Sequence, residues 1–101
     1  MNIKANNVRQ KLESDIGFTI NLDTDGREKV NGLIDFGGKL NGVGKNSMVL
    51  AAACEVRGKR TPANATTIQV LNVVPKEDEL WIRLDINGEP INFRVHVIVF
   101  F

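Results

Sequence analysis

The C-terminal stretch Leu80–Phe101, LWIRLDINGEPINFRVHVIVFF, carries the clearest structural pattern in the chain. Apolar residues alternate with polar or charged ones on both sides of an Asn-Gly pair, Asn87 and Gly88, and no breaker interrupts either run. Alternation with a period of two is typical of strands with one buried face, and Asn-Gly is typical of a tight hairpin turn. The stretch therefore predicts a long C-terminal hairpin.

The last strand of this hairpin differs from the rest because both of its faces become apolar after Val97. Ile98, Val99, Phe100 and Phe101 are all hydrophobic. A strand with two apolar faces is usually central in its sheet, or it pairs with another copy of the chain. We therefore expect both faces of this segment to be covered.

Three segments upstream of the hairpin also have the character of strands. Phe18 to Leu22 alternates apolar and polar residues, and Val30 to Phe36 can return as its hairpin partner across the turn at 24–26. Thr66 to Val74 is rich in β-branched residues and is stopped by Pro75. Together with the C-terminal hairpin, these segments predict an antiparallel sheet of about five strands.

The N-terminal segment has the spacing of a short helix. Asn7 can cap it, and Val8, Leu12 and Ile16 fall at i, i+4 and i+8, so they form one apolar stripe. Gly17 can supply the left-handed residue that ends a helix. A helix of about ten residues is marginal alone, so we expect its stripe to pack on the sheet.

Residues 48–57 fit either a helix or a strand. Ser47 can cap a helix, the alanines at 51–53 favour one, and Gly58 can end it. Residues 54–57 alternate instead, as in a strand, and periodicity does not separate a buried helix from a buried strand in so short an apolar run. The helix is the preferred interpretation and the strand stays open.

These elements predict a single domain, residues 1–101, of the α+β class, with the N-terminal helix packed on the antiparallel sheet. The alternative is a mainly-β sandwich or small barrel with one helix, in which 48–57 is also a strand. The predicted core consists of the inward-facing residues of these elements: Val8, Leu12, Ile16, Phe18, Ile20, Leu50, Ile68, Val70, Leu80, Ile82, Leu84, Phe93, Val95, Val97 and Val99.

Composition excludes several classes of protein. The 101 residues are 43% hydrophobic and 25% charged with a formal net charge of +1, which is typical of a globular protein. No apolar run approaches the roughly 20 residues of a membrane-spanning helix, and no secretion signal opens the chain. One cysteine and one histidine exclude an internal disulfide and the usual zinc ligand sets. We expect a cytoplasmic protein without membrane partner, metal or cofactor.

No catalytic motif stands out. A phosphate-binding loop fails because Lys39 stands where its first glycine is required, and Asn46 follows Lys45 in place of Ser or Thr. Cys54 lies in an apolar run, which favours a buried, inert thiol. A Cys54–His96 pair would require these two residues to meet in space, and nothing in the sequence brings them together. We therefore expect no enzymatic activity.

The first functional hypothesis is a small protein-interaction module that self-associates or binds and inhibits a partner protein. A tryptophan on the more polar face of a sheet is a favoured interface anchor, and the apolar end of the chain needs a cover. The candidate interface residues are Trp81, Arg83, Arg94, Phe100 and Phe101.

The alternative hypothesis is a nucleic-acid-binding accessory protein that uses the basic segment 39–60. This segment has five basic residues against one acidic residue, and the stretch after Pro75 is locally acidic. Clustered lysines and arginines are the electrostatic signature of phosphate binding. The candidate residues are Lys39, Lys45, Arg57, Lys59 and Arg60.

Overall fold

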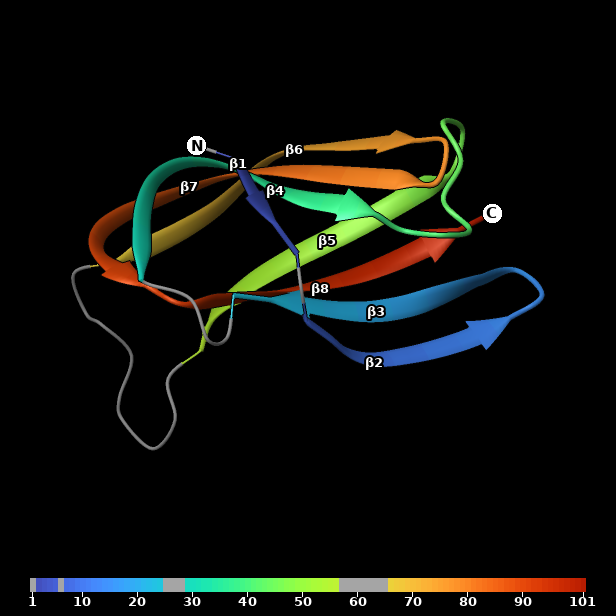
Figure 1. Cartoon of the computed structure of the whole chain (residues 1–101), viewed down its shortest axis with the longest axis horizontal. Helices are drawn as coiled ribbons and strands as arrows, with labels where there is room; N and C mark the ends of the chain where they lie inside the picture. The colour runs from blue at the N-terminus through green and yellow to red at the C-terminus, as the bar shows by residue number, and fades with distance from the viewer. Residues whose placement is uncertain (1, 6, 25–28, 57–65) are drawn as a thin grey trace.

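The computed structural model describes residues 2–5, 7–24, 29–56 and 66–101. In these residues, eight strands form two four-stranded sheets that face each other as a sandwich (Figure 1). Sheet A has the order β1 (Asn2–Lys4), β4 (Val30–Lys39), β7 (Glu79–Ile91) and β6 (Thr67–Lys76). Sheet B has the order β2 (Asn7–Ser14), β3 (Gly17–Asp23), β8 (Phe93–Phe100) and β5 (Met48–Glu55). All pairings are antiparallel except that of β1 with β4, and β5 lies close to β6 where the two sheets approach.

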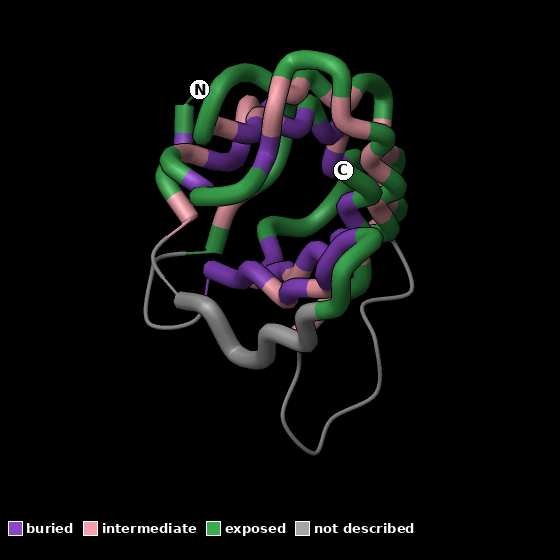
Figure 2. Tube along the Cα trace, turned by 90° about the vertical axis from the view of Figure 1, so that its right-hand side faces the viewer, coloured by how far each residue is buried: buried purple, intermediate pink, exposed green. Residues whose placement is uncertain are grey.

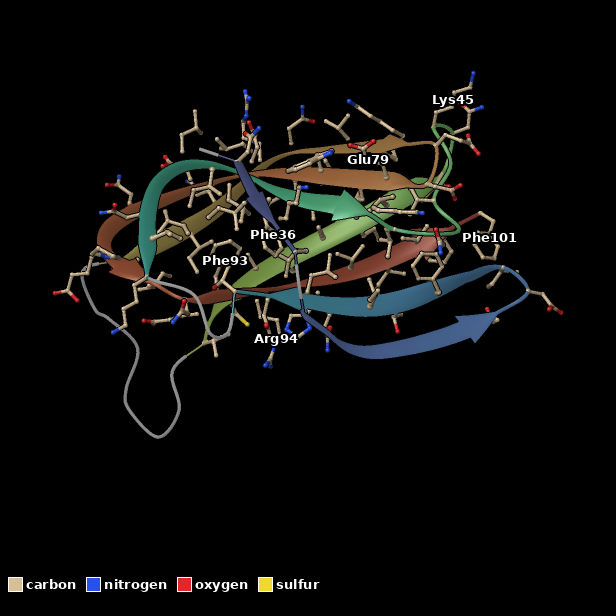
Figure 3. All side chains as sticks on the ribbon, in the orientation of Figure 1. Phe36, Lys45, Glu79, Phe93, Arg94 and Phe101 are labelled. Atoms are coloured by element: carbon tan, nitrogen blue, oxygen red, sulfur yellow. The ribbon has the colours of Figure 1, made fainter. Side chains whose placement is uncertain are left out.

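The core lies between the two sheets, and every second residue of β7 and β8 points into it. Figure 2 shows the buried residues gathered on the facing sides of the two layers. Phe36 of sheet A and Phe93 of sheet B meet near the middle, with ring centroids 4.9 Å apart and planes at 72° (Figure 3). An edge-to-face aromatic pair adds to the free energy gained from burying the two rings.

The predicted C-terminal hairpin is wrong, although both of its strands are present. β7 pairs with β4 and β6 in sheet A, whereas β8 pairs with β3 and β5 in sheet B. The Asn-Gly segment lies at an irregularity in the pairing of β4 with β7: Val30 pairs with Ile91 and Gly32 with Ile86, so residues 87–90 of β7 stand opposite the single residue Asn31 of β4. Alternation reports which face a strand buries, but it does not report which strand it pairs with.

Buried Thr24 holds the chain where it passes from β7 to β8. Its hydroxyl accepts a 2.9 Å hydrogen bond from the Phe93 N–H, and its own N–H donates to the Phe93 carbonyl over 3.0 Å. On the other side of the crossing, the Val56 N–H donates to the Asn92 carbonyl over 2.9 Å. The carbonyls of Asn92 and Phe93 and the N–H of Phe93 are therefore all paired at the crossing, as buried polar groups require.

The predicted N-terminal helix is also wrong, because Asn7–Ser14 is strand β2 and pairs with β3 through a turn at residues 15 and 16. A spacing of four residues is one helical turn, but it is also two full periods of a strand. The spacing of 8, 12 and 16 alone therefore does not identify a helix. In the structure the three residues form no single row, because the register of β2 shifts between Val8 and Lys11 and Ile16 lies in the turn. Pairing with a neighbouring strand outweighs the weak propensity of a short helix.

The preferred helix over 48–57 is wrong as well, since Met48–Glu55 is strand β5 at one edge of sheet B. The described part of the chain contains no helix, so the α+β class is overturned, together with the helix of the mainly-β alternative. The predicted partnership of Phe18–Leu22 with Val30–Phe36 fails for the same reason as the C-terminal hairpin. β3 belongs to sheet B and β4 to sheet A.

Most predicted core residues of β3, β7 and β8 are buried. Ile16 and Leu50 are exposed instead, and the side chains of Val8 and Leu12 lie outside the described part. β8 is central in sheet B, as its apolar character predicted, but its outer face stays exposed at Ile98 and Phe100. This uncovered face is the most unusual feature of the fold.

Candidate functional site

The outer face of sheet B is divided into an apolar half and a polar half. Strand register places its outward residues in rows across β3, β8 and β5. The apolar half contains the rows Gly17–Phe100–Met48 and Thr19–Ile98–Leu50, and the polar half contains Asn21–His96–Ala52 and Asp23–Arg94–Cys54. Directly opposed side chains lie within about 5.5 Å of each other at Cβ, so each row is a contact set.

The apolar half exposes an unusual amount of hydrophobic surface. The exposed fractions are 70% for Ile16, 63% for Met48, 54% for Leu50, 39% for Ile98 and 36% for Phe100. We call these five residues the apolar patch. Ile16, Ile98 and Phe100 also line an open depression of about 230 Å³ beside the β2–β3 turn. Contiguous apolar surface of this kind marks an interaction site more often than an isolated exposed leucine does.

The polar half brings together Cys54, His96 and Asn21 from β5, β8 and β3. The Cys54 Sγ lies 3.6 Å from the His96 Nε2, and the His96 Nδ1 lies 2.7 Å from the Asn21 Oδ1. Sequence reasoning considered a Cys54–His96 pair but found nothing to bring the two together, and it did not single out Asn21. It also predicted a buried thiol where Cys54 is exposed. Alternation puts each residue on a strand face, but only the register between strands distant in the sequence makes them neighbours.

Arg94 lies at the border of the polar half, and its side chain points away from sheet A (Figure 3). Its Nη2 is 3.5 Å from the Oδ2 of fully buried Asp23. Its Nε has no hydrogen-bond partner among the described residues. Within the described part of the chain the guanidinium is therefore only partly paired, and Arg94 stands directly opposite Cys54 in the register.

Trp81 and Arg83, the first two predicted interface residues, lie on the opposite side of the molecule, on the outer face of sheet A. The Trp81 Nε1 donates to the Glu79 carboxylate. The Arg83 guanidinium forms a bidentate pair with the Asp35 carboxylate: its Nε donates to Oδ1 at 2.8 Å and its Nη2 to Oδ2 at 3.2 Å. These polar groups are paired within the chain, so this face offers a partner fewer unsatisfied groups than its composition suggested.

The Asp35–Arg83 pair gives sheet A a small pH dependence. The hydrogen bond from Arg83 lowers the pKa of Asp35, so the pair stabilises the fold above the ordinary carboxyl range and this contribution disappears as pH falls through the lowered value. We expect Asp35→Asn to unfold at slightly lower urea concentration than the wild type at neutral pH, and at the same concentration once the pH is below the lowered pKa of Asp35. Because both side chains are partly exposed, added salt should shrink the difference.

Arg83→Gln removes the other partner of the same pair and should reproduce this pH dependence. A difference that persists unchanged into strong acid would contradict the assignment, because the carboxyl is then protonated in both folded and unfolded chains.

The end of the sandwich brings the basic and acidic segments of the sequence together within one chain. Lys45 and Phe101 line an open hollow of about 500 Å³ together with Glu77 and Asp78. Lys39 is the register partner of Glu79. Phe101 packs on Phe18, with ring centroids 6.0 Å apart, and lies at this end of the molecule (Figure 3). The predicted residues Arg57, Lys59 and Arg60 lie outside the described part of the chain.

No family model, curated protein or solved structure matches this chain. Within the described ranges there is no group of three or more His, Cys, Asp and Glu residues placed to hold a metal ion. The described strands and turns also include no helix long and apolar enough to cross a membrane. The geometry of the two outer faces is therefore what bears on function.

Proposed function

We propose that the protein is a small non-enzymatic interaction module that self-associates through the apolar patch on the outer face of sheet B. The observation that supports this is the register of Met48, Leu50, Ile98 and Phe100 on two adjacent strands, with exposed Ile16 beside them. A sheet face of this composition resembles the inner face of a sandwich, which packs on a second sheet about 10 Å away.

A second copy of the chain is the occupant that fits the patch best. None of the five patch residues is charged, so the surface that covers them must be apolar and flat, and the same patch on another copy meets both conditions. A two-fold axis perpendicular to the strands lets the apolar halves overlap while the polar halves extend to opposite ends. Arg94, whose side chain is partly exposed, is then spared the free-energy cost of desolvation.

The size of the face predicts a weak dimer. Three strands about 4.8 Å apart and eight residues long cover roughly 14 by 26 Å, and the apolar half is about 180 Å² of that footprint. Stable complexes bury about 800 Å² of accessible surface on each partner. We therefore expect association that depends on protein concentration rather than an obligate dimer.

Two other surfaces are less well supported as interaction sites. The outer face of sheet A also exposes apolar residues, Leu33 and Val74 with half-buried Trp81, but these lie among the charged residues Asp35, Glu79 and Arg83. In the basic segment, the described lysines Lys39 and Lys45 are offset by acidic neighbours of the β6–β7 turn. We therefore do not propose nucleic-acid binding as the function, and the experiments below distinguish it from self-association.

The test is sedimentation of the wild type over a wide range of concentrations, together with two matched variants. Leu50→Lys places a charge in the apolar patch and should raise the dimer dissociation constant about tenfold or more. Leu33→Lys changes the same residue type at the same 54% exposure on sheet A, so it should leave dimerisation unchanged. A wild type that stays monomeric throughout, or equal effects of the two variants, would contradict the proposal.

Salt separates the two functional hypotheses. Apolar self-association should persist between about 50 and 200 mM salt, whereas binding of a single-stranded oligonucleotide through lysines and arginines should weaken steeply over that range. Oligonucleotide binding that follows this salt dependence, with no self-association at any concentration, would replace the proposed function with the nucleic-acid-binding alternative.

A further inference from the structure

The Cys54–His96–Asn21 cluster has the arrangement of an activated nucleophile. The Asn21 carbonyl oxygen is an acceptor only, so the His96 Nδ1 at 2.7 Å must carry the proton that it donates. In the neutral imidazole this leaves Nε2 as the acceptor, and Nε2 is the atom that faces the Cys54 Sγ at 3.6 Å. A nucleophile, a base and a group that orients the base thus follow one another across three strands.

The surroundings of this cluster favour its reaction with a molecule that approaches from solution. Cys54 and His96 are both exposed, and all three residues stand on paired strands rather than on a loop. Arg94, directly opposite Cys54, presents a partly exposed guanidinium whose carboxylate partner Asp23 is fully buried. An approaching molecule therefore meets a thiol, an imidazole and a positive charge on one open surface.

We infer that Cys54 is a reactive thiol that forms mixed disulfides with small anionic disulfides. His96 Nε2 takes the proton of the Cys54 thiol, and the thiolate attacks one sulfur of the incoming disulfide. A new bond forms between Cys54 Sγ and that sulfur, the old S–S bond breaks, and its second sulfur leaves as a thiolate that takes the proton from His96. The incoming disulfide is the oxidant, and Cys54 is oxidised once per chain.

The geometry favours disulfide exchange over hydrolysis. Ester and amide hydrolysis needs hydrogen-bond donors aimed at a developing oxyanion. Strand β8, which carries His96 and Arg94, has its backbone paired on both sides with β3 and β5, so its N–H groups are not available to an oxyanion. Disulfide exchange places its developing charge on sulfur and needs an accessible thiolate, which a flat sheet face provides.

The test measures the rate at which dithiobis(nitrobenzoic acid), a disulfide with two carboxylates, reacts with the folded protein at low concentration. The chain has one cysteine, so the released chromophore reports Cys54 alone. The control is Thr67→Cys in a Cys54→Ser background, since Thr67 is exposed on an edge strand opposite uncharged Asn87. We expect Cys54 to react at least tenfold faster than the control thiol.

Variants of the two partners test the roles of the imidazole and the amide. His96→Gln should reduce the rate at Cys54 to that of the control thiol. Asn21→Leu should slow it because Asn21 is a positioning residue, and Asn21→Asp should restore it because a carboxylate oxygen still accepts from Nδ1. Both sites lie on the outer face, and a cooperative thermal transition for each of the three variants verifies that it folds.

A comparison of probes tests the preference for anions. Arg94→Gln should slow the dicarboxylate disulfide more than it slows the uncharged dithiodipyridine. The inference would be overturned if Cys54 reacted no faster than the control thiol, or if His96→Gln left its rate unchanged. These results are independent of dimerisation, so failure of this inference and failure of the proposed function are distinguishable.

Discussion

Replacing Phe93 with alanine is expected to lower the free energy of unfolding by about 4 kcal/mol. Phe93 is fully buried at the start of β8 and packs edge-to-face on Phe36 from the other sheet. Truncation removes this contact between the two layers and leaves a cavity that the surrounding strands cannot close. Because small domains have total stabilities of about 5–15 kcal/mol, this single change should bring the fold close to unfolding.

Urea denaturation of the variant measures this loss, and Phe100→Ala is its matched control. Phe100 lies on the same strand but on the outer face, where its ring is partly exposed. Its truncation should change the stability of the monomer by about 1 kcal/mol or less. Equal losses for the two variants would contradict the assignment of the inner and outer faces of sheet B.

Substitution of Gly37 by alanine should destabilise the protein by a comparable amount. Gly37 has a φ of 156°, and a Cβ at this position would stand 2.0 Å from the carbonyl oxygen of Leu80 on β7. Backbone strain of about 2 kcal/mol adds to about 2 kcal/mol for forcing paired strands apart. The close approach of β4 to β7 therefore depends on the absence of a side chain at this position.

Gly38→Ala separates these two contributions. Gly38 has a similar φ of 147°, but its added Cβ would meet no atom within 4 Å. This variant should show only the strain, about half the loss seen for Gly37→Ala. If denaturant midpoints show the same loss for both variants, the collision with β7 plays no part and this register of β4 against β7 is incorrect.

The alternating patterns predicted burial better than they predicted strand pairing. Leu80, Ile82 and Leu84 of β7 are buried where the alternation placed them, as are Phe93 and Val95 of β8. Their partners were misassigned because an Asn-Gly pair favours a hairpin locally, while β4 and β6 pair with β7 on either side. Whether a strand pairs with its neighbour across a local turn or with strands distant in the sequence depends on the free energies of the alternative pairings. A single sequence does not reveal these free energies.

The same holds for the candidate sites: alternation predicted which residues lie on one face, but not which residues of distant strands become neighbours. The exposed apolar end of β8 followed from Ile98 and Phe100 being apolar on the face opposite Val97 and Val99, although it was expected to be covered. The reactive cluster did not follow, because Cys54 and His96 are 42 residues apart and become neighbours through the β5–β8 register. Asn21 is 75 residues from His96, and no sequence motif singles it out as a functional residue.

The order in which the strands occur along the chain has a consequence for how the protein folds. β8, the last strand, is one of the two inner strands of sheet B, and it separates β3 from β5. Before β8 is placed, sheet B consists of the β2–β3 hairpin and an unpaired β5, and an isolated hairpin is at best marginally stable. Folding of this half must therefore await contacts between distant parts of the chain, which is typical of slow-folding β-sandwiches.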